Sequence, residues 1–314
     1  MRDTYGVSAL AFTIVALLLS GPVPAMLARA AWPLRAPRAA IVLWQSIALV
    51  AVLSAFSAGI AIASRLFILG DDGRPTAMFT SEIAILGWPL WTVYVTVFAL
   101  TLMVGFRLIV SVLNGAIATR RRRAHHRMVV DLVGAPHATA PQLRILDVAE
   151  PFAYCVPGVR GRVVLSEGAL NTLSNNEITA ILKHEQAHLR ARHDLVLEMF
   201  TALHAAFPRF VRSANALTAV RLLIESLADD AAARTTGPTP LARALVACAS
   251  GCTPSGALAA GGPTTVVRVR RLAGKPNSLI LAAGAYSAAA AVIVIPTIAL
   301  ALPWLAELHR LFGA

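Results

Sequence analysis

One short segment of this 314-residue chain carries residues whose types and spacing suit zinc-assisted hydrolysis. Residues 184–188 read His-Glu-Gln-Ala-His, the pattern H-E-x-x-H. Two histidines four positions apart lie on one face of a helix, so His184 and His188 can bind the same tetrahedral Zn²⁺. Glu185 is rotated by about 100° around that helix, where it can act as general base toward a water that zinc polarises. The segment predicts one zinc ion per chain, with Glu185 as the catalytic residue.

A catalytic zinc site needs a third protein ligand and leaves its fourth position for water. A third histidine in the pattern H-E-x-x-H-x-x-G-x-x-H is excluded, because Ala191 stands at the glycine position and Asp194 at the last one. Glu225 and Asp229 lie one turn apart on a second helical segment. Taken alone they would be a solvated helix face. Beside H-E-x-x-H they predict Glu225 as the third metal ligand and Asp229 as the residue that holds the outer N–H of a ligand histidine.

The elements that must position these residues can also be predicted. A capping box, Ser174-Asn-Asn-Glu177, starts the helix of the motif. Short strands are expected at 142–148, 152–156 and 159–165, and helices at 166–172, 194–207, around Glu225 to Arg234, and after Gly237. An extended substrate can pair with an exposed edge strand, for which we nominate 152–156 or 163–165.

The composition is that of a membrane protein. Mean hydropathy is +0.68, and 14% of residues are charged, against about 25% in soluble domains. Apolar runs long enough to cross a bilayer lie at about 4–28, 39–64, 83–106 and 279–305. The segment 21–24, Gly-Pro-Val-Pro, should kink or end the first run near its far side.

Arginines decide the predicted orientation. Arg29, Arg35 and Arg38 fill the first loop, and the run Arg120–Arg127 follows the third span. By the positive-inside rule both face the cytoplasm, which leaves the second loop (65–82) and both termini outside. Residues 107–278 then form a cytoplasmic domain between the third and fourth spans, with 306–314 as a short extracytoplasmic tail. The net charge of +12 does not indicate direct nucleic-acid binding, because the basic residues flank apolar spans without a recognition motif.

The order of these features resembles the BlaR/MecR-type membrane metallopeptidases, which are beta-lactam-responsive signal transducers. Three spans are followed by Pro-Phe-Ala-Tyr-Cys-Val-Pro-Gly (151–158), a Val-Leu-Ser strand end (164–166), H-E-x-x-H, Asp194, E-x-x-A-D and a last span. The resemblance implies a gluzincin-type zinc domain with His184, His188 and Glu225 as ligands and Glu185 as base. The expected fold class is therefore an α-helical membrane protein with four transmembrane helices and an inserted cytoplasmic α+β metallopeptidase domain.

The resemblance also implies a function: proteolysis of a cytoplasmic BlaI/MecI-type transcriptional repressor in antibiotic-resistance signalling at the plasma membrane. Family receptors carry a penicillin-binding domain after the last span, whereas this chain stops at Ala314 without an S-x-x-K and K-T-G module. We therefore expect the signal to enter by another route, such as a separate sensor partner, with a homodimer also possible. The alternatives are a quality-control or prenyl-protein peptidase of the HtpX kind, and a non-catalytic receptor with a structural zinc domain.

Two features are left with open interpretations. The oxyanion-stabilising residue could be His193, Arg221 or Tyr154. The basic segment Val267–Arg271 could be a self-cleavage site, although a positive flank of the last span is the favoured interpretation.

Overall fold

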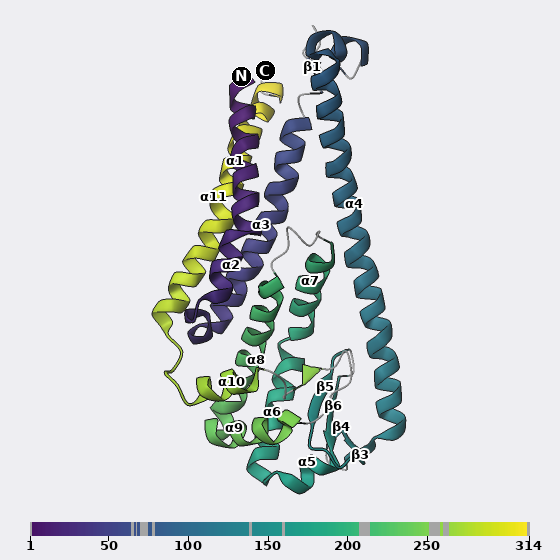
Figure 1. The fold of residues 1–314 in the computed structure, drawn as a ribbon, viewed down its shortest axis with the longest axis vertical. Helices are drawn as coiled ribbons and strands as arrows, with labels where there is room; N and C mark the ends of the chain where they lie inside the picture. The colour runs from purple at the N-terminus through teal and green to yellow at the C-terminus, as the bar shows by residue number, and fades with distance from the viewer. Residues whose placement is uncertain are drawn as a thin grey trace.

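A computed structural model shows a bundle of long helices standing on a smaller mixed domain (Figure 1). It describes residues 2–63, 66, 68–69, 75–76, 79–137, 140–158, 161–206, 214–250, 258–259 and 264–312. Side chains are described within these ranges except at 2–9, 68–69, 75–76, 79–82, 84–85, 205–206, 214–215, 250, 258–259 and 300–312. Most of the predicted second loop, Cys252 and the last residues of the predicted tail lie outside the described residues.

Within the described residues, four helices are long and apolar enough to cross a membrane: Leu10–Arg29, Pro37–Ala63, Leu86–Val133 and Leu279–Ala299. The first contains the predicted break, because α1 (Arg2–Ser20) ends before Gly21 and α2 (Pro22–Arg29) begins at a proline. The short 3-10 helix η1 (Trp32–Arg35) leads into α3 (Pro37–Ala63). Helices α1 and α11 (Leu279–Phe312) both pack on α3. The N-terminal end of α1 and the C-terminal end of α11 both lie at the side of the bundle remote from the mixed domain (Figure 1).

The third long helix extends much further than the sequence predicts. α4 (Phe79–Val133) bends at Gly87, where φ is 72°, and then continues past Phe106 to Val133 in the mixed domain. The predicted boundary at residue 107 therefore falls inside one unbroken helix. Because no proline or glycine pair interrupts residues 107–133, the helical hydrogen bonds continue after the apolar run ends.

The mixed domain contains a five-stranded sheet in the order β3-β4-β6-β5-β7. Its strands are β3 (Ala135–His137), β4 (Ala140–Leu146), β5 (Ala153–Val156), β6 (Arg162–Ser166) and β7 (Leu258–Ala259). β4 and β6 are parallel, and the other pairs are antiparallel. The nomination of 163–165 as an edge strand is wrong, because β6 is hydrogen-bonded on both sides. β5 carries β7 on its outer side at Tyr154 and Cys155.

Helices complete the domain and cover the sheet. They are α5 (Glu167–Thr172), α6 (Asn175–Arg190), α7 (His193–Ala206), α8 (Ala214–Thr236), α9 (Pro238–Ala247) and α10 (Thr265–Leu272), with a 3-10 turn, η3, at Cys248–Ser250. One core joins β6, α6, α8 and α9 through buried residues that include Leu165, Ile181 and Leu241. A second core joins α3 to α7 and α8 through Trp44, Phe200 and Ile224. The mixed domain is thus packed directly on the membrane helices.

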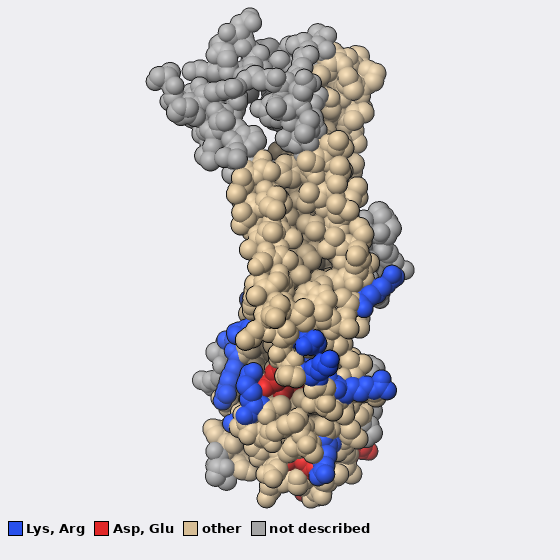
Figure 2. Space-filling view, turned by 90° about the vertical axis from the view of Figure 1, so that its left-hand side faces the viewer, with Lys and Arg blue, Asp and Glu red and all other residues tan. Residues whose placement is uncertain are grey.

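Charged residues gather at one end of the molecule. In Figure 2 the shaft formed by the long helices shows no charged side chain over most of its length, whereas Lys, Arg, Asp and Glu lie on the mixed domain and on the adjoining ends of the helices. This distribution is the one expected when the shaft lies in a bilayer and the mixed domain in water.

Candidate metal centre

Helix α6 carries both motif histidines and begins at a residue that fixes its register. The Ser174 N–H donates to Glu177 Oε2 at 2.9 Å, and the Ser174 side chain accepts from the Glu177 backbone, so the predicted capping box is confirmed. Three turns further on, the face that packs on the sheet and α8 contains His184, Glu185 and His188, all buried. The imidazoles therefore point into the domain rather than toward water.

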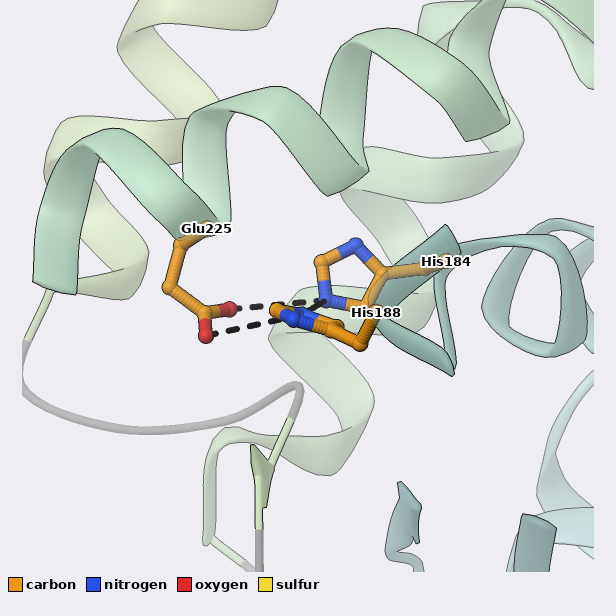
Figure 3. Close-up of side chains that lie close together, drawn as sticks. All are labelled: His184, His188 and Glu225. Atoms are coloured by element: carbon orange, nitrogen blue, oxygen red, sulfur yellow. Dashed lines mark hydrogen bonds and ion pairs between the residues drawn. The ribbon is translucent and has the colours of Figure 1, made fainter. Parts of the chain in front are cut away.

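The three predicted ligands meet at one point (Figure 3). The Nε2 atoms of His184 and His188 are 3.2 Å apart. Glu225, from α8, places Oε2 3.4 Å from His184 Nε2 and Oε1 3.6 Å from His188 Nε2. Ligand atoms on a tetrahedral Zn²⁺ with bonds of about 2.0–2.1 Å stand about 3.3 Å from one another. The residues present therefore fit a metal ion of this size bound by two histidines and one glutamate.

Glu185 lies beside this point with its carboxylate unused. The side chain is fully buried, and neither carboxylate oxygen accepts from an N–H or O–H group among the described residues; the neighbouring polar group is the buried, weakly donating thiol of Cys155. Burial, with Glu225 nearby, raises the pKa of Glu185 to about 7, although the adjacent His184 opposes the shift. An unpartnered buried carboxylate is costly to maintain. Its geometry suits a general base whose partner is a water or a substrate.

The outer nitrogens of the two histidines have different partners. His184 Nδ1 lies 3.0 Å from Asp229 Oδ1, the geometry predicted for Asp229. Burial alone would lower the pKa of His184, but the Asp229 and Glu225 carboxylates raise it to about 9, so a metal ion that binds there must displace a proton.

His188 faces a third imidazole instead of a carboxylate, because its Nδ1 lies 3.0 Å from His193 Nδ1. The chain reaches this position through Arg192, whose φ is 52°, so the turn forms without the glycine of the rejected motif. His193 thus stands behind a ligand and is not itself placed as one.

Arg268 was not among the predicted site residues, yet it lies inside the centre. Its side chain is 1% exposed. The guanidinium donates to Asp229 at 2.9 and 2.6 Å, pairs with Glu225 Oε2 at 3.0 Å, and reaches within 3.4 Å of His184 Nε2. Once a bound metal ion has displaced the His184 proton, Glu225 and Asp229 against Arg268 leave one negative charge, and Glu185 adds a second when ionised. The cluster therefore retains a negative charge that suits a divalent cation.

The arginines of α10 change the interpretation of the segment 267–271. It is helical, and Arg271 pairs with Asp230 at 2.8 Å while its Nε donates to the Leu34 carbonyl at 2.6 Å. The segment is therefore a helix anchored through Arg271 rather than an extended chain, and Arg270 remains exposed on it. Arg268 and Arg271 lie one helical turn apart, so both can reach the acidic residues on one face of α8. This spacing is the sequence signal for the pairing of the two helices.

Two arginines of the run 120–127 are anchored to the mixed domain. Arg123 Nη1 lies 2.8 Å from Asp194 and 2.5 Å from Glu198 of α7, and Arg127 donates to the Pro157 carbonyl at 2.8 Å. Gly158, at φ 154°, lies so close to Arg127 that a Cβ there would stand 2.2 Å from Nη1. Only Arg120, Arg121 and Arg122 remain exposed among the arginines of this run.

The three oxyanion candidates are placed differently. His193 faces His188, and the Tyr154 hydroxyl lies 3.1 Å from His126 Nε2 with the side chain buried. Arg221 is exposed one turn before Glu225 on α8. Arg221 is therefore the one exposed side chain of the three.

The chain is similar in sequence to known peptidases. The sequence model described as peptidase family M48 matches residues 117–275, just over half of the chain. A protein described as a protease HtpX homolog, from Methanothermobacter thermautotrophicus, is 31% identical over 80 residues. That match covers 25% of this chain and 31% of the relative, so the chain matches about a third of the relative's length. No solved structure matches this chain.

Proposed function

This chain belongs to peptidase family M48, and from that premise we propose that it is a membrane-anchored zinc endopeptidase that cleaves proteins on the cytoplasmic side. Family and relative indicate a metalloprotease, a hydrolase of peptide bonds. One observation carries the proposal. Three ligand atoms converge beside a buried, unpartnered carboxylate, as a hydrolytic metal site with an open position requires.

Each residue of the centre has a task in this reaction. His184, His188 and Glu225 would hold the metal, which supplies Lewis acidity toward a peptide carbonyl and acidifies water. Glu185 would take the proton of the attacking water and pass it to the leaving amine, because its carboxylate lies beside the three ligands. Asp229 and Arg268 fix the orientation of His184 and Glu225.

The arginines beside the catalytic domain support a cytoplasmic location for it. Arg29, Arg35 and Arg38 are exposed in the loop at the same end of the bundle as this domain. The positive-inside rule assigns that end to the cytoplasm, and both termini to the other side. Cysteines introduced in the Arg29–Arg38 loop should therefore be labelled by a membrane-impermeant maleimide only after the cells are opened.

Two classes of substrate are compatible with this site. The order of spans and the segment 151–158 favour a regulatory target, a BlaI/MecI-type repressor. The similarity to a protease HtpX homolog supports the alternative, a quality-control role. We propose regulated cleavage of the repressor first, because a domain packed on α2, α3 and α4 can receive a signal from the membrane.

The experiment expresses the protein in cells together with two candidate substrates, which serve as reporters. One is the repressor encoded nearest to it, and the other is a misfolded membrane protein. The chain and its Glu185→Gln form are each co-expressed with both, and reporter size is followed by immunoblot. Cleavage of the repressor by the parent alone supports the regulatory role, and cleavage of the misfolded protein alone supports quality control. If both forms cleave or neither does, while the metal is bound, the catalytic proposal fails.

A further inference from the structure

A cavity of about 260 Å³ lies where the membrane helices meet the catalytic domain. It is bounded by α1, α3, α7 and α8 and is separate from the metal centre. Its walls are almost entirely apolar, and they include Leu17, Trp44, Ala51, Phe200 and Leu217. Apart from Ser20 and His204 the lining is apolar, so the cavity favours a hydrocarbon.

The cavity has the depth and the opening of a lipid site. Along α3 its lining runs from Trp44 to Ala55, a rise of about 16 Å, which is about half of the roughly 30 Å hydrocarbon core and so matches one leaflet. Leu17 lines the cavity and is 64% exposed, and Ala55 is exposed as well. The cavity therefore opens on the outer surface of the bundle, where a membrane helix faces lipid chains.

Trp44, at the end of the cavity lining nearest the catalytic domain, carries an unused hydrogen-bond donor. Trp44 is 2% exposed, yet its indole Nε1–H has no partner among the residues that the structure describes. Buried indole N–H groups normally donate to an acceptor, because leaving them unpaired costs free energy. A ligand that is apolar along its length would pack on the apolar lining. An oxygen at this end of the ligand could accept the hydrogen bond of the indole N–H.

Cations lie at the same end of α3. Arg38 precedes Trp44 by six residues, about 9 Å along the helix axis, and Arg35 stands just before α3 begins. Both side chains are exposed, and neither forms an ion pair with an acidic residue in the described part of the chain. A phosphate at the level of the headgroups would therefore meet positive charge next to the mouth of the cavity.

We propose that the cavity binds one acyl chain of a phospholipid from the leaflet next to the catalytic domain. The hydrocarbon lies along Ala51 and Leu217, the ester carbonyl accepts the Trp44 indole N–H, and the phosphate lies near Arg35 and Arg38. The bound acyl chain completes the packing between α3 and the α7–α8 pair. Since Ile224 belongs to the same hydrophobic core as Trp44 and Phe200 and precedes Glu225, the lipid also stabilises the helix that carries the third metal ligand.

The test measures contact between Trp44 and a lipid chain. The full chain is made with Trp32, Trp88, Trp91 and Trp304 replaced by Phe, so that Trp44 is the one fluorophore. It is reconstituted in nanodiscs of a phospholipid whose acyl chains carry bromine, which quenches indole on contact. We expect Trp44 to lose most of its fluorescence although the protein buries it.

Two matched variants separate the cavity from the surrounding lipid. Ala51→Phe fills the cavity and should restore the fluorescence, whereas Leu53→Phe adds bulk at a position that is 50% exposed and outside the lining, and should leave the quenching unchanged. Thermal unfolding and retained metal binding check that both variants fold. Equal quenching in the parent and in Ala51→Phe would overturn the proposal.

A second experiment, in detergent, tests whether the bound acyl chain belongs to a phospholipid or to a free fatty acid. Brominated phospholipid and brominated free fatty acid are added separately, and the bound mass is read by native mass spectrometry. One retained phospholipid per parent chain, lost in Ala51→Phe, supports the assignment. Retention and quenching with the fatty acid alone would overturn the phospholipid as occupant.

Discussion

Arg268 donates hydrogen bonds from Nε and Nη2 to the two carboxylate oxygens of Asp229, at 2.9 and 2.6 Å, although 39 residues separate them in the chain. Asp229 in turn lies 3.0 Å from His184 Nδ1. The helix that precedes α11 is therefore tied to a proposed metal ligand through one buried carboxylate. Substitutions in this network and in the pairs around it should therefore change the stability and the metal affinity of the protein.

Removal of Arg268 should destabilise the domain strongly. Arg268→Ala leaves the Glu225 and Asp229 carboxylates buried without their cation, and breaking a buried pair in this way costs about 3–5 kcal/mol. We expect the thermal midpoint of the metal-free protein to fall accordingly. Arg270→Ala is the matched control, since Arg270 is exposed on the same helix. Equal midpoints for the two variants would show that the pairing does not stabilise the fold.

Asp229 should tune metal affinity through His184. Asp229→Asn keeps the shape but removes the charge that orients and polarises the imidazole, and losses of this kind weaken metal binding by about 10- to 100-fold. Competition with a chromogenic chelator measures the affinity. The exposed Asp147 provides the control Asp147→Asn, which should bind metal like the parent. An unchanged affinity in Asp229→Asn would exclude this role.

Glu185 should make the stability of the metal-free protein depend on pH. Its pKa is about 7 in the folded state against 4.5 for the free group, so its contribution is fully present below pH 4.5 and is lost as pH rises through 7. Glu185→Gln should therefore match the parent near pH 4.5 and be more stable at pH 8, by on the order of 3 kcal/mol.

Unfolding of chelator-treated protein between pH 4.5 and 8 measures this difference. The exposed Glu150 supplies the control Glu150→Gln, for which the difference from the parent should stay flat. A flat difference for Glu185→Gln as well would mean that Glu185 is not held in a buried, unpartnered state.

Arg271 and Asp230 should act as a coupled pair that holds α10 to α8. Both guanidinium Nη atoms contact Asp230, at 2.8 Å each, and the pair is 10% and 17% exposed. A double-mutant cycle with Arg271→Ala and Asp230→Ala should give a coupling free energy of about 0.5–3 kcal/mol.

The more exposed pair Arg144–Asp131, where Asp131 is 37% exposed, should give about 0–1 kcal/mol in the same measurement. Amide hydrogen exchange in α10 should also accelerate in Arg271→Ala. Additive effects of the two α10–α8 substitutions, with unchanged exchange, would contradict the coupling.

Features that depend on neighbours along the chain could be predicted from the sequence. The capping box at Ser174 starts α6 where expected, because its two hydrogen bonds join residues three apart. The break between α1 and α2 follows from proline geometry, and the apolar runs correspond to four helices long enough to span a bilayer. The proposed ligands His184 and His188 share one face because they are one helical turn apart.

Features that depend on contacts between distant residues were decided only by the tertiary structure. The spacing of Glu225 and Asp229 suggested a ligand and its support, but the convergence of Glu225 on two imidazoles requires α8 to pack across α6. β6 is a central strand because β4 joins it from the other side, which no pattern within 163–165 reveals. Arg268 reads as a surface residue in the sequence. It is buried because the carboxylates of α8 offset its charge, and the positions of those carboxylates exist only in the folded chain.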